Sequence, residues 1–483
     1  MKKLILKSLK SKIQGDIFSS KEFKEFYSVD ASSYKIIPSI VVIPKHEKDV
    51  INVIRIAKKF KTPVTARGAG TGLVGSALNR GIILDMQKFD QIRITKKYAI
   101  IGSGTIKGKI DKELERAKKF FPPNPSVGSY CSVGGMLGNN SSGSRSLKYG
   151  SVIDNVEEIT FVDGNARKIT LPKNKKISNE IIKFSKLVES KKFPNTSKNS
   201  SGYRIDKVKS IEDTHKIIIG SEGTLGVILS AKIKIKEMPK KRILYIIGYK
   251  SIYVAVRECM KINQTAPTAI EFMDELTLHQ IKFKFVKNTK CVLYVEYDED
   301  ITKKEKELQS VITGRIIKKL KKEQEIEQWW RYRDLSLYYS LRTIKKEKRV
   351  PHIIEDAAVP LKNLPKVFSL LNEINKKYRT KCIVYGHAGN GNVHVRLIAD
   401  RIKTKIIKNI AKEYFNEIIK LQGTITAEHG DGLARSEFVK KQYGTQNYRI
   451  FKEIKKLFDP TNILNPGKII SKKSTIISNL EKF

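Results

Sequence analysis

The sequence predicts a protein of mixed helices and strands (α+β) with two domains, and three observations support this class. The chain has 483 residues, 40% of them apolar, which is enough to bury a sizeable core. From Ile36 to Lys236, short apolar runs alternate with stretches of helical periodicity. After Pro239 the composition changes, and apolar strands are interleaved with strongly charged helices. We therefore expect one domain over residues 36–237 and another over residues 238–470.

The elements can be assigned in chain order. Residues 1–35 are expected to form an N-terminal helical segment, and residues 471–483 a tail. Apolar residues recur at helical spacing after Pro44, which predicts a helix over Asp49–Phe60. A strongly charged helix is expected over Ile301–Val311. The apolar runs that predict strands are Ile40–Ile43, Pro63–Ala66, Gly81–Met86, Ile243–Gly248 and Cys291–Tyr297.

The net charge of +45 raises a different possibility, because such a surplus points first to nucleic acid or to an anionic membrane. Lysines, however, occur in pairs and triplets on most predicted helices rather than in one patch with interleaved aromatic residues. The sequence also carries no recognisable RNA-binding or helix-turn-helix motif. We therefore expect no nucleic-acid partner, and a nucleic-acid-binding protein stays the alternative from another functional class.

The four cysteines are far apart and form no CxxC pair, so the chain has no zinc ribbon or iron–sulfur cluster motif of its own. Few, scattered cysteines favour a reducing compartment. The first residues lack the apolar region of a signal peptide, and no window of 18 uncharged apolar residues occurs. These observations predict a cytoplasmic protein.

Glycine-rich loops predict a binding site for an extended anionic ligand. The first, Arg67–Ala77, contains a GxGxxG match at Gly70–Gly75, but a strand is predicted from Gly81, which leaves no room for the helix of a Rossmann motif. Closely spaced glycines still present backbone N–H groups to an anion, and we interpret the loop as a pyrophosphate cradle. A plain glycine-rich turn is the alternative.

Two further loops strengthen this interpretation. Cys131–Ser144 and Gly220–Gly226 are also rich in glycine and small residues, and each lies next to apolar runs. Gly134, Gly135 and Gly138 allow a ligand to approach the main chain where a Cβ atom would block it. Together, the loops predict one extended ligand that lies close to the backbone along its length.

Two C-terminal motifs bring together three of the seven histidines. In an extended strand Asn392, His394 and Arg396 point to one face, and the glycine turn before them can return His387 to the same pocket. Two imidazoles and a carboxylate make an open three-ligand site for Zn²⁺ or a similar ion. Glu428 and His429 are neighbours that diverge in extended backbone, so one can bind metal while the other faces substrate. Scattered core histidines are the alternative.

These motifs, in this order from Pro44 to Gly467, resemble the FAD-linked dehydrogenases of the vanillyl-alcohol-oxidase (PCMH-type) fold. The resemblance is to the D-2-hydroxyacid dehydrogenase branch, which includes D-lactate dehydrogenase, D-2-hydroxyglutarate dehydrogenase and the FAD subunit of glycolate oxidase. It implies an FAD-binding domain with two subdomains, about 36–98 and 99–237, followed by a cap domain at 238–470 that carries substrate.

The resemblance also implies the cofactor contacts. The first loop would take the pyrophosphate, the second would line the cofactor, the third would close around the adenosine side, and a C-terminal segment would return to the flavin. The implied FAD-binding residues are Arg67, Gly68, Ala69, Gly70, Thr71, Gly72, Gly75, Ser76, Ser132, Val133, Gly134, Gly135, Gly138, Asn139, Asn140, Ser142, Gly143, Tyr149, Gly150, Val152, Glu222, Gly223, Leu225, Gly226, Val227, Ile228 and Asn465.

For the reaction, the resemblance implies oxidation of a D-2-hydroxy acid, with D-lactate first and then glycolate or D-2-hydroxyglutarate. The hydroxyl proton leaves to a base while a hydride leaves the α-carbon for flavin N5. The implied metal ligands, for Zn²⁺, Mn²⁺ or Fe²⁺, are His387, His394 and Glu428. The implied catalytic residues are His429 as general base, Asn392 as a substrate contact and Arg333 as a carboxylate clamp, although a surface arginine is the alternative for Arg333.

The same resemblance sets expectations for partners. A separate iron–sulfur or flavoprotein subunit is expected to accept the electrons, and the protein is expected to form a homo- or hetero-oligomer. A quinone-linked acceptor and peripheral attachment to the inner face of the membrane also fit. An FAD oxidase that uses oxygen on another alcohol is the alternative enzyme, but such relatives generally do not require the histidine–glutamate motif.

Overall fold

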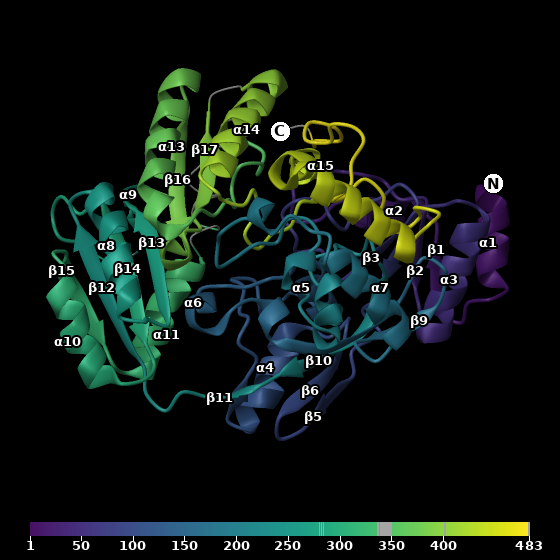
Figure 1. Ribbon diagram of the computed structural model, residues 1–483, viewed down its shortest axis with the longest axis horizontal. Helices are drawn as coiled ribbons and strands as arrows, with labels where there is room; N and C mark the ends of the chain where they lie inside the picture. Colours follow the sequence, from purple (N-terminus) through teal and green to yellow (C-terminus); the bar gives the residue numbers. More distant parts are fainter. Residues whose placement is uncertain are drawn as a thin grey trace.

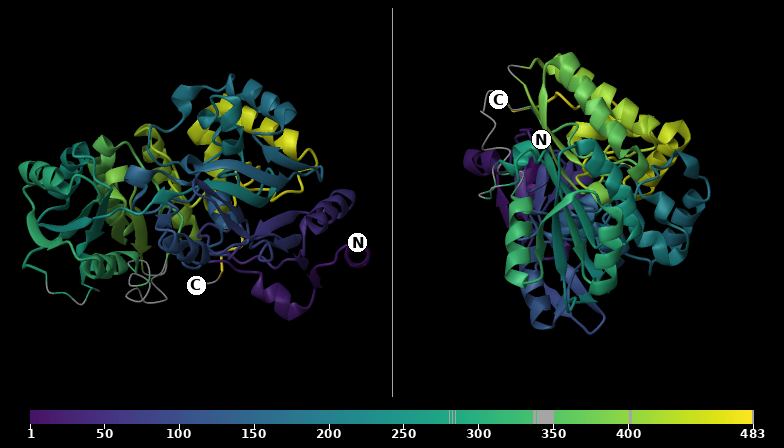
Figure 2. Two further views of the ribbon diagram at one scale, coloured as in Figure 1. Left: turned by 90° about the horizontal axis from the view of Figure 1, so that it is seen from below. Right: turned by 90° about the vertical axis from the view of Figure 1, so that its left-hand side faces the viewer.

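The structure of the chain is a computed structural model, which describes residues 1–279, 281, 283, 285–335, 338, 350–399 and 402–481. The chain folds into two lobes that lie side by side (Figure 1). Residues up to Glu237 form one lobe with three sheets, and the next residues form the other lobe around one large sheet. Helix α15 (Gly432–Phe458) then crosses back onto the first lobe (Figures 1 and 2).

The first sheet has the order β1-β2-β4-β3, with β2, β4 and β3 parallel and β1 added antiparallel at the edge. Helix α3 covers it, because Val50, Val53 and Ile54 are fully buried on one side of the helix. Helix α1 packs against α3 at the end of the molecule that is far from the second lobe (Figure 2). The bounds are α1 Lys2–Lys10, β1 Asp16–Phe18, α2 Lys21–Phe26, β2 Ile40–Ile43, α3 Glu47–Lys59, β3 Val64–Arg67 and β4 Ile82–Asp85.

The second sheet is antiparallel and has the order β5-β6-β10-β8-β9. Its strands are β5 Ile92–Ile94, β6 Tyr98–Gly102, β8 Val156–Val162, β9 Lys168–Leu171 and β10 Val227–Lys234. A small ribbon pairs β7 (Lys119–Phe120) with β11 (Lys236–Glu237). The helices of this part are α4 Lys107–Arg116, α5 Val133–Asn139, α6 Ser146–Tyr149 and α7 Lys175–Ser185.

The second lobe, the cap, is built on an antiparallel sheet with the order β15-β12-β14-β13-β16-β17. Helices α8, α13 and α14 pack in the core on one face, and α11 packs its tryptophans on the other. Its strands are β12 Ile243–Tyr249, β13 Ala269–Asp274, β14 Cys291–Tyr297, β15 Arg315–Leu320, β16 Lys381–Gly386 and β17 His394–Ile398. Its helices are α8 Ile252–Gln264, α9 Glu275–Leu278, α10 Ile301–Val311, α11 Glu323–Asp334, α13 Leu364–Tyr378 and α14 Thr404–Lys420.

The predicted elements are confirmed, and β2, β14 and α10 have the predicted bounds. The N-terminal segment was expected to be helical, but it also supplies β1, because Asp16–Phe18 pairs with the exposed edge of β2. The C-terminal tail is packed against the first lobe: Ile476 is fully buried, and its carbonyl accepts a hydrogen bond from the Tyr34 hydroxyl.

Candidate active site

A cavity of about 530 Å³ lies between the two lobes, and both contribute to its wall. The first lobe supplies the three glycine-rich loops. The cap supplies Arg333 at the end of α11, Tyr385 in β16, and His394 and Arg396 in β17, and the loop before α15 adds Glu428 and His429. Two ion pairs join the lobes nearby, because Arg145 binds Glu296 and Lys148 binds Asp298, at 2.6 Å each.

The glycine-lined end has the shape and chemistry that an extended dinucleotide requires. The chain from β3 to β4 contains no helix, so the GxGxxG match is confirmed as something other than a Rossmann motif. Gly70 has a φ of +71° and Gly223 a φ of +69°, which favours glycine at both turns. At Gly138 a Cβ atom would meet nothing closer than 4.0 Å, so the wall keeps open space there. This end therefore fits FAD.

Most of the predicted cofactor residues lie in the cavity wall. They are Arg67, Gly68, Ala69, Gly70, Thr71, Gly72, Ser76, Ser132, Gly134, Gly135, Gly138, Asn139, Ser142, Glu222, Gly223, Gly226 and Ile228. The structure brings these together from three segments that are distant in sequence. The second segment was predicted to be a loop, but its residues Val133–Asn139 form helix α5.

The other predicted cofactor residues lie behind the wall. They are Gly75, Val133, Asn140, Gly143, Tyr149, Gly150, Val152, Leu225, Val227 and Asn465. Some of them, such as Val133, belong to the hydrophobic core, and others form hydrogen bonds that hold the glycine-rich segments in place. Asn465 donates to the carbonyls of Ser76 and Glu222, which ties two loops together. The Tyr149 hydroxyl donates to Asp298 of the cap, so this residue joins the lobes.

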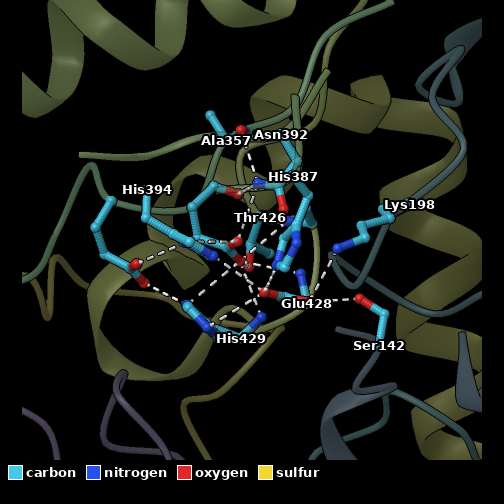
Figure 3. A network of polar contacts seen from close by, with 12 residues as sticks. Ser142, Lys198, Ala357, His387, Asn392, His394, Thr426, Glu428 and His429 are labelled. Atoms are coloured by element: carbon cyan, nitrogen blue, oxygen red, sulfur yellow. Dashed lines mark hydrogen bonds and ion pairs between the residues drawn. The ribbon is translucent and has the colours of Figure 1, made fainter. Parts of the chain in front are cut away.

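At the other end of the cavity, imidazole and carboxylate groups converge on Glu428 (Figure 3). Its Oε1 atom lies 3.0 Å from Nε2 of His387 and 3.2 Å from Nε2 of His394. His394 lies in the wall, whereas His387 stands directly behind it and is 2% exposed. The predicted metal trio is thus brought together, although His387 and His394 come from β16–β17 and Glu428 from a loop 34 residues later.

The other oxygen of Glu428 is held by the first lobe. Its Oε2 accepts hydrogen bonds from the Ser142 hydroxyl and, at 3.1 Å, from the Gly143 amide and from Nζ of buried Lys198. Although burial disfavours the charge, Lys198 and His387 hold the pKa of Glu428 well below its usual value. Sequence reasoning missed Lys198, because it lies in the stretch 173–209, which is rich in Lys, Ser and Asn, and a lysine in such a stretch usually faces solvent.

His429 faces the cavity next to Glu428, with its Nε2 atom 3.8 Å from Glu428 Oε1. Its Nδ1 atom lies 2.6 Å from Glu355 Oε1. Burial alone would lower the pKa of His429, but the carboxylates of Asp356 and Glu355 outweigh it and raise the pKa to about 9. The ring is therefore oriented by one nitrogen while the other is directed toward the metal trio.

A second layer of carboxylates, which sequence reasoning missed, fixes this end. Asp356 Oδ2 accepts the amides of three successive residues, 427–429, and so shapes the loop that carries Glu428 and His429. Glu271 of β13 lies 2.7 Å from Nδ1 of His387. One signal was available, because Glu271, Glu355 and Asp356 stand in apolar runs where an unpaired charge is costly.

The two other predicted catalytic residues have different positions. Arg333 lies in the wall, but its Nε atom donates to Glu271 at 2.5 Å. Asn392 is fully buried outside the wall, and its Nδ2 atom donates to the Ala357 carbonyl at 3.1 Å. Asn392 thus holds the turn that carries Glu355 and Asp356; it lies outside the cavity wall, and its contact with substrate stays a prediction.

The donor set fits a divalent metal. Two imidazole Nε2 atoms face one carboxylate oxygen, and both rings have a carboxylate on Nδ1, Glu271 for His387 and, at 3.5 Å, Glu355 for His394. Asp356, His394, Glu428 and His429 also place one atom each within 4.8 Å of one another. We favour His387 over Asp356 as a ligand, because Asp356 Oδ2 is already occupied by backbone amides.

Comparison with known proteins agrees that the chain is built to bind FAD. A family model described as the C-terminal domain of FAD linked oxidases matches residues 238–469, and one described as an FAD binding domain matches residues 38–171. Glycolate oxidase subunit GlcD of Bacillus subtilis is 28% identical over 92% of each chain. D-lactate dehydrogenase of Archaeoglobus fulgidus is 28% identical over 90% of this chain and 91% of its own.

Two further similarities agree. D-2-hydroxyglutarate dehydrogenase of Escherichia coli is 26% identical over 94% of this chain, which spans half of that longer protein. A solved structure of alkyldihydroxyacetonephosphate synthase superposes with a TM-score of 0.69 over 96% of this chain and 86% of its own, at 18% identity, and shares the fold. The predicted α+β class and FAD-binding domain are confirmed. The chain belongs to the FAD-dependent oxidoreductases of the D-2-hydroxyacid dehydrogenase family.

Proposed function

We propose that the protein oxidises a D-2-hydroxy acid to the 2-oxo acid, with D-lactate as the first candidate, followed by glycolate and D-2-hydroxyglutarate. The observation that carries this proposal is the convergence of His387, His394 and Glu428 at one end of a cavity whose other end is lined by the glycine loops of the FAD-binding domain. Relatives named for these three substrates support the same class of reaction.

In this proposal His429 is the general base. Glu355 accepts a hydrogen bond from Nδ1, so Nε2 is the nitrogen that takes the hydroxyl proton. Because neighbouring carboxylates raise the pKa of His429 to about 9, its ring is protonated at neutral pH. A divalent metal bound to Glu428, whose Oε1 atom lies 3.8 Å from Nε2 of His429, would lower this pKa and favour the neutral ring that a general base requires.

His387, His394 and Glu428 would hold a divalent metal, Zn²⁺ or Mn²⁺/Fe²⁺, which would lower the pKa of the substrate hydroxyl. FAD, when bound, supplies the acceptor for the hydride from the α-carbon. Lys198, Ser142 and the Gly143 amide hold the carboxylate of Glu428 in place, and His394 and Tyr385 close the cavity wall beside it.

We also propose that the electrons pass to a separate acceptor, either an iron–sulfur or flavoprotein subunit or a quinone-linked carrier. This proposal rests on the four cysteines, which are scattered along the chain and form no cluster motif. The described part of the chain contains no helix that is both long and apolar enough to cross a membrane.

The test is anaerobic reduction of the flavin in protein loaded with FAD and metal. D-lactate, glycolate, D-2-hydroxyglutarate and the L-enantiomers of the chiral acids are mixed with the enzyme, and the visible absorbance of the flavin is followed. We expect at least one of the acids with the D-configuration, or glycolate, to bleach the flavin, and the L-enantiomers to leave it oxidised. An oxidised flavin throughout the panel would refute the proposed reaction.

A further inference from the structure

Two arginines lie at the cap end of the cavity wall in the described part of the chain, and they differ in how their charge is used. From this difference we propose that Arg396, rather than Arg333, binds the carboxylate of the substrate. This inference rests on the proposed function, because it names the group that recognises an acid at the same site. It makes Arg396 the residue that selects acids over neutral hydroxy compounds.

The guanidinium of Arg333 is already engaged. Its Nε donates to Glu271 at 2.5 Å, Nη1 to the Ser126 hydroxyl at 3.3 Å, and Nη2 lies 3.4 Å from Nδ1 of His387. Both Arg333 and Glu271 are at most 1% exposed, so this is a buried ion pair. Using Arg333 to bind an acid would leave the Glu271 carboxylate short of its partner in the core, which is costly.

Arg396 is in the opposite situation. Its side chain is 3% exposed, and its Nε and Nη1 atoms have no hydrogen-bond partner among the residues that the structure describes. Nη2 lies 3.8 Å from Glu355 Oε2, and the guanidinium also interacts with the Tyr385 hydroxyl, which lies in the same wall. Buried guanidinium donors without partners are unfavourable, and each of these two nitrogens flanks Nη2, with which it can bind a carboxylate in a bidentate arrangement. The cavity wall therefore holds a buried guanidinium group, and the carboxylate of a bound acid would complete its hydrogen bonds.

The position of Arg396 suits this role. Arg396 and His394 are two residues apart in β17, so both side chains stand on the same face of the strand, about 7 Å apart along it. His394 contacts Glu428, where the proposed reaction places the hydroxyl. A 2-hydroxy acid carries its carboxylate on the carbon that bears the hydroxyl, so the anchors for its two groups must be neighbours. His394 and Arg396 are neighbours in the wall.

The test compares an acid with its neutral amide, so that charge recognition is separated from folding. Pyruvate and glyoxylate, each beside its amide, are titrated into FAD-loaded wild-type, R396Q, R396K and R333Q proteins, and binding is read from the shift of the flavin spectrum. We expect R396Q to bind the acids about 100-fold more weakly and the amides nearly as before. R396K should be intermediate, because lysine keeps the charge but loses the fork.

Three results would overturn the assignment. Equal weakening of acid and amide in R396Q would mean that ordered water or packing, and not substrate, completes the guanidinium. Loss of the preference for acids in R333Q alone would mean that Arg333, and not Arg396, binds the carboxylate. A wild-type protein that binds no 2-oxo acid of the panel would mean that neither arginine binds one. Binding requires no turnover, so it can be tested separately from the reaction. If the protein binds pyruvate through Arg396 but no D-2-hydroxy acid reduces its flavin, the proposed reaction is refuted while the role of Arg396 in binding the carboxylate stands.

Discussion

The two ends of the cavity are built in different ways. The glycine-lined end consists of two loops and helix α5, each continuous in sequence, and it uses backbone and small side chains. The cap end consists of single side chains from β13, β16, β17, α11 and two loops, and nearly all of them are charged and buried. The comparison teaches that binding of the cofactor and the chemistry on the substrate are separable, because they depend on different groups. Five predictions test that separation.

The largest effect is expected from metal removal. Chelation should reduce flavin reduction by D-lactate by about 10³- to 10⁴-fold, because a divalent ion supplies several kcal/mol of charge stabilisation. FAD content should not change, since the three proposed ligands lie outside the glycine-rich loops, and Ser142 and Gly143 bind the oxygen of Glu428 that faces away from His387 and His394. Turnover and bound flavin are measured before chelation, after it, and after Zn²⁺ or Mn²⁺ is returned. Full turnover after verified metal removal would contradict the assignment of His387, His394 and Glu428.

His429→Asn should lower the rate of flavin reduction by about 10³-fold, because general-base catalysis contributes about 10² to 10⁴. Flavin should stay bound, since His429 belongs to the cap end of the cavity. His279→Asn is the matched control, because His279 is exposed and lies outside the wall. Rapid-mixing absorbance measures both variants, and a near-normal rate in His429→Asn would remove the general base.

Lys198→Met should destabilise the fold by about 3 kcal/mol, because it leaves the Glu428 carboxylate buried with one charge partner fewer. Lys168→Met is the control: Lys168 also forms an ion pair, with Glu47, but both side chains are about half exposed, and such pairs contribute less than about 1 kcal/mol. Urea unfolding gives both values. Equal losses in the two variants would show that burial of the Lys198 pair is unimportant.

Gly138→Ala should weaken FAD binding by about 10-fold while the apoprotein becomes slightly more stable. The added Cβ atom enters the open space of the cavity and displaces only ligand, and alanine is favoured over glycine in helix α5 by about 0.5–1 kcal/mol. Flavin fluorescence gives the affinity and thermal unfolding of the apoprotein gives the stability. A simultaneous loss of both would mean that Gly138 serves packing instead.

The smallest effect is expected from Glu355→Gln. A general base works in its neutral form, so the rate falls as pH drops below its pKa. Glu355 is one of three carboxylates, with Asp356 and Glu428, that raise the pKa of His429, and its loss should therefore move the acid limb of the kcat/KM profile to lower pH by about one unit. Glutamine still accepts the hydrogen bond from Nδ1. An unshifted or upward-shifted limb would contradict the electrostatic account of His429.

The difference between the two ends also decides how much could be predicted from the sequence. The glycine loops were predictable, because each is a local motif whose backbone geometry depends on its own residues. The histidine motifs were predictable for the same reason, since His387 and His394 are seven residues apart in one hairpin. Apolar runs and helical periodicity also placed seven elements, three of them (β2, β14 and α10) with the observed bounds and the others within one or two residues.

The partners of these motifs could not be predicted, because they arise from tertiary contacts. Lys198 reaches Glu428 across 230 residues, and Glu271 reaches His387 across 116. Arg333 was expected to be a clamp from its segment alone, but only the fold shows that Glu271 holds it. Likewise, Asn392 shares a strand face with His394 in sequence, yet the turn before β17 directs it toward Ala357.

The most direct test of the central claim is a single-turnover measurement at the junction of the two ends. Protein loaded with FAD and metal is mixed anaerobically with the best acid of the panel, either unlabelled or carrying deuterium on the carbon that bears the hydroxyl. We predict that the flavin is bleached within one turnover and that deuterium slows the bleaching, because that C–H bond breaks as the flavin is reduced. Bleaching at the same rate with both acids would contradict the claim that breakage of this C–H bond limits reduction of the flavin, and no bleaching would refute the proposed reaction.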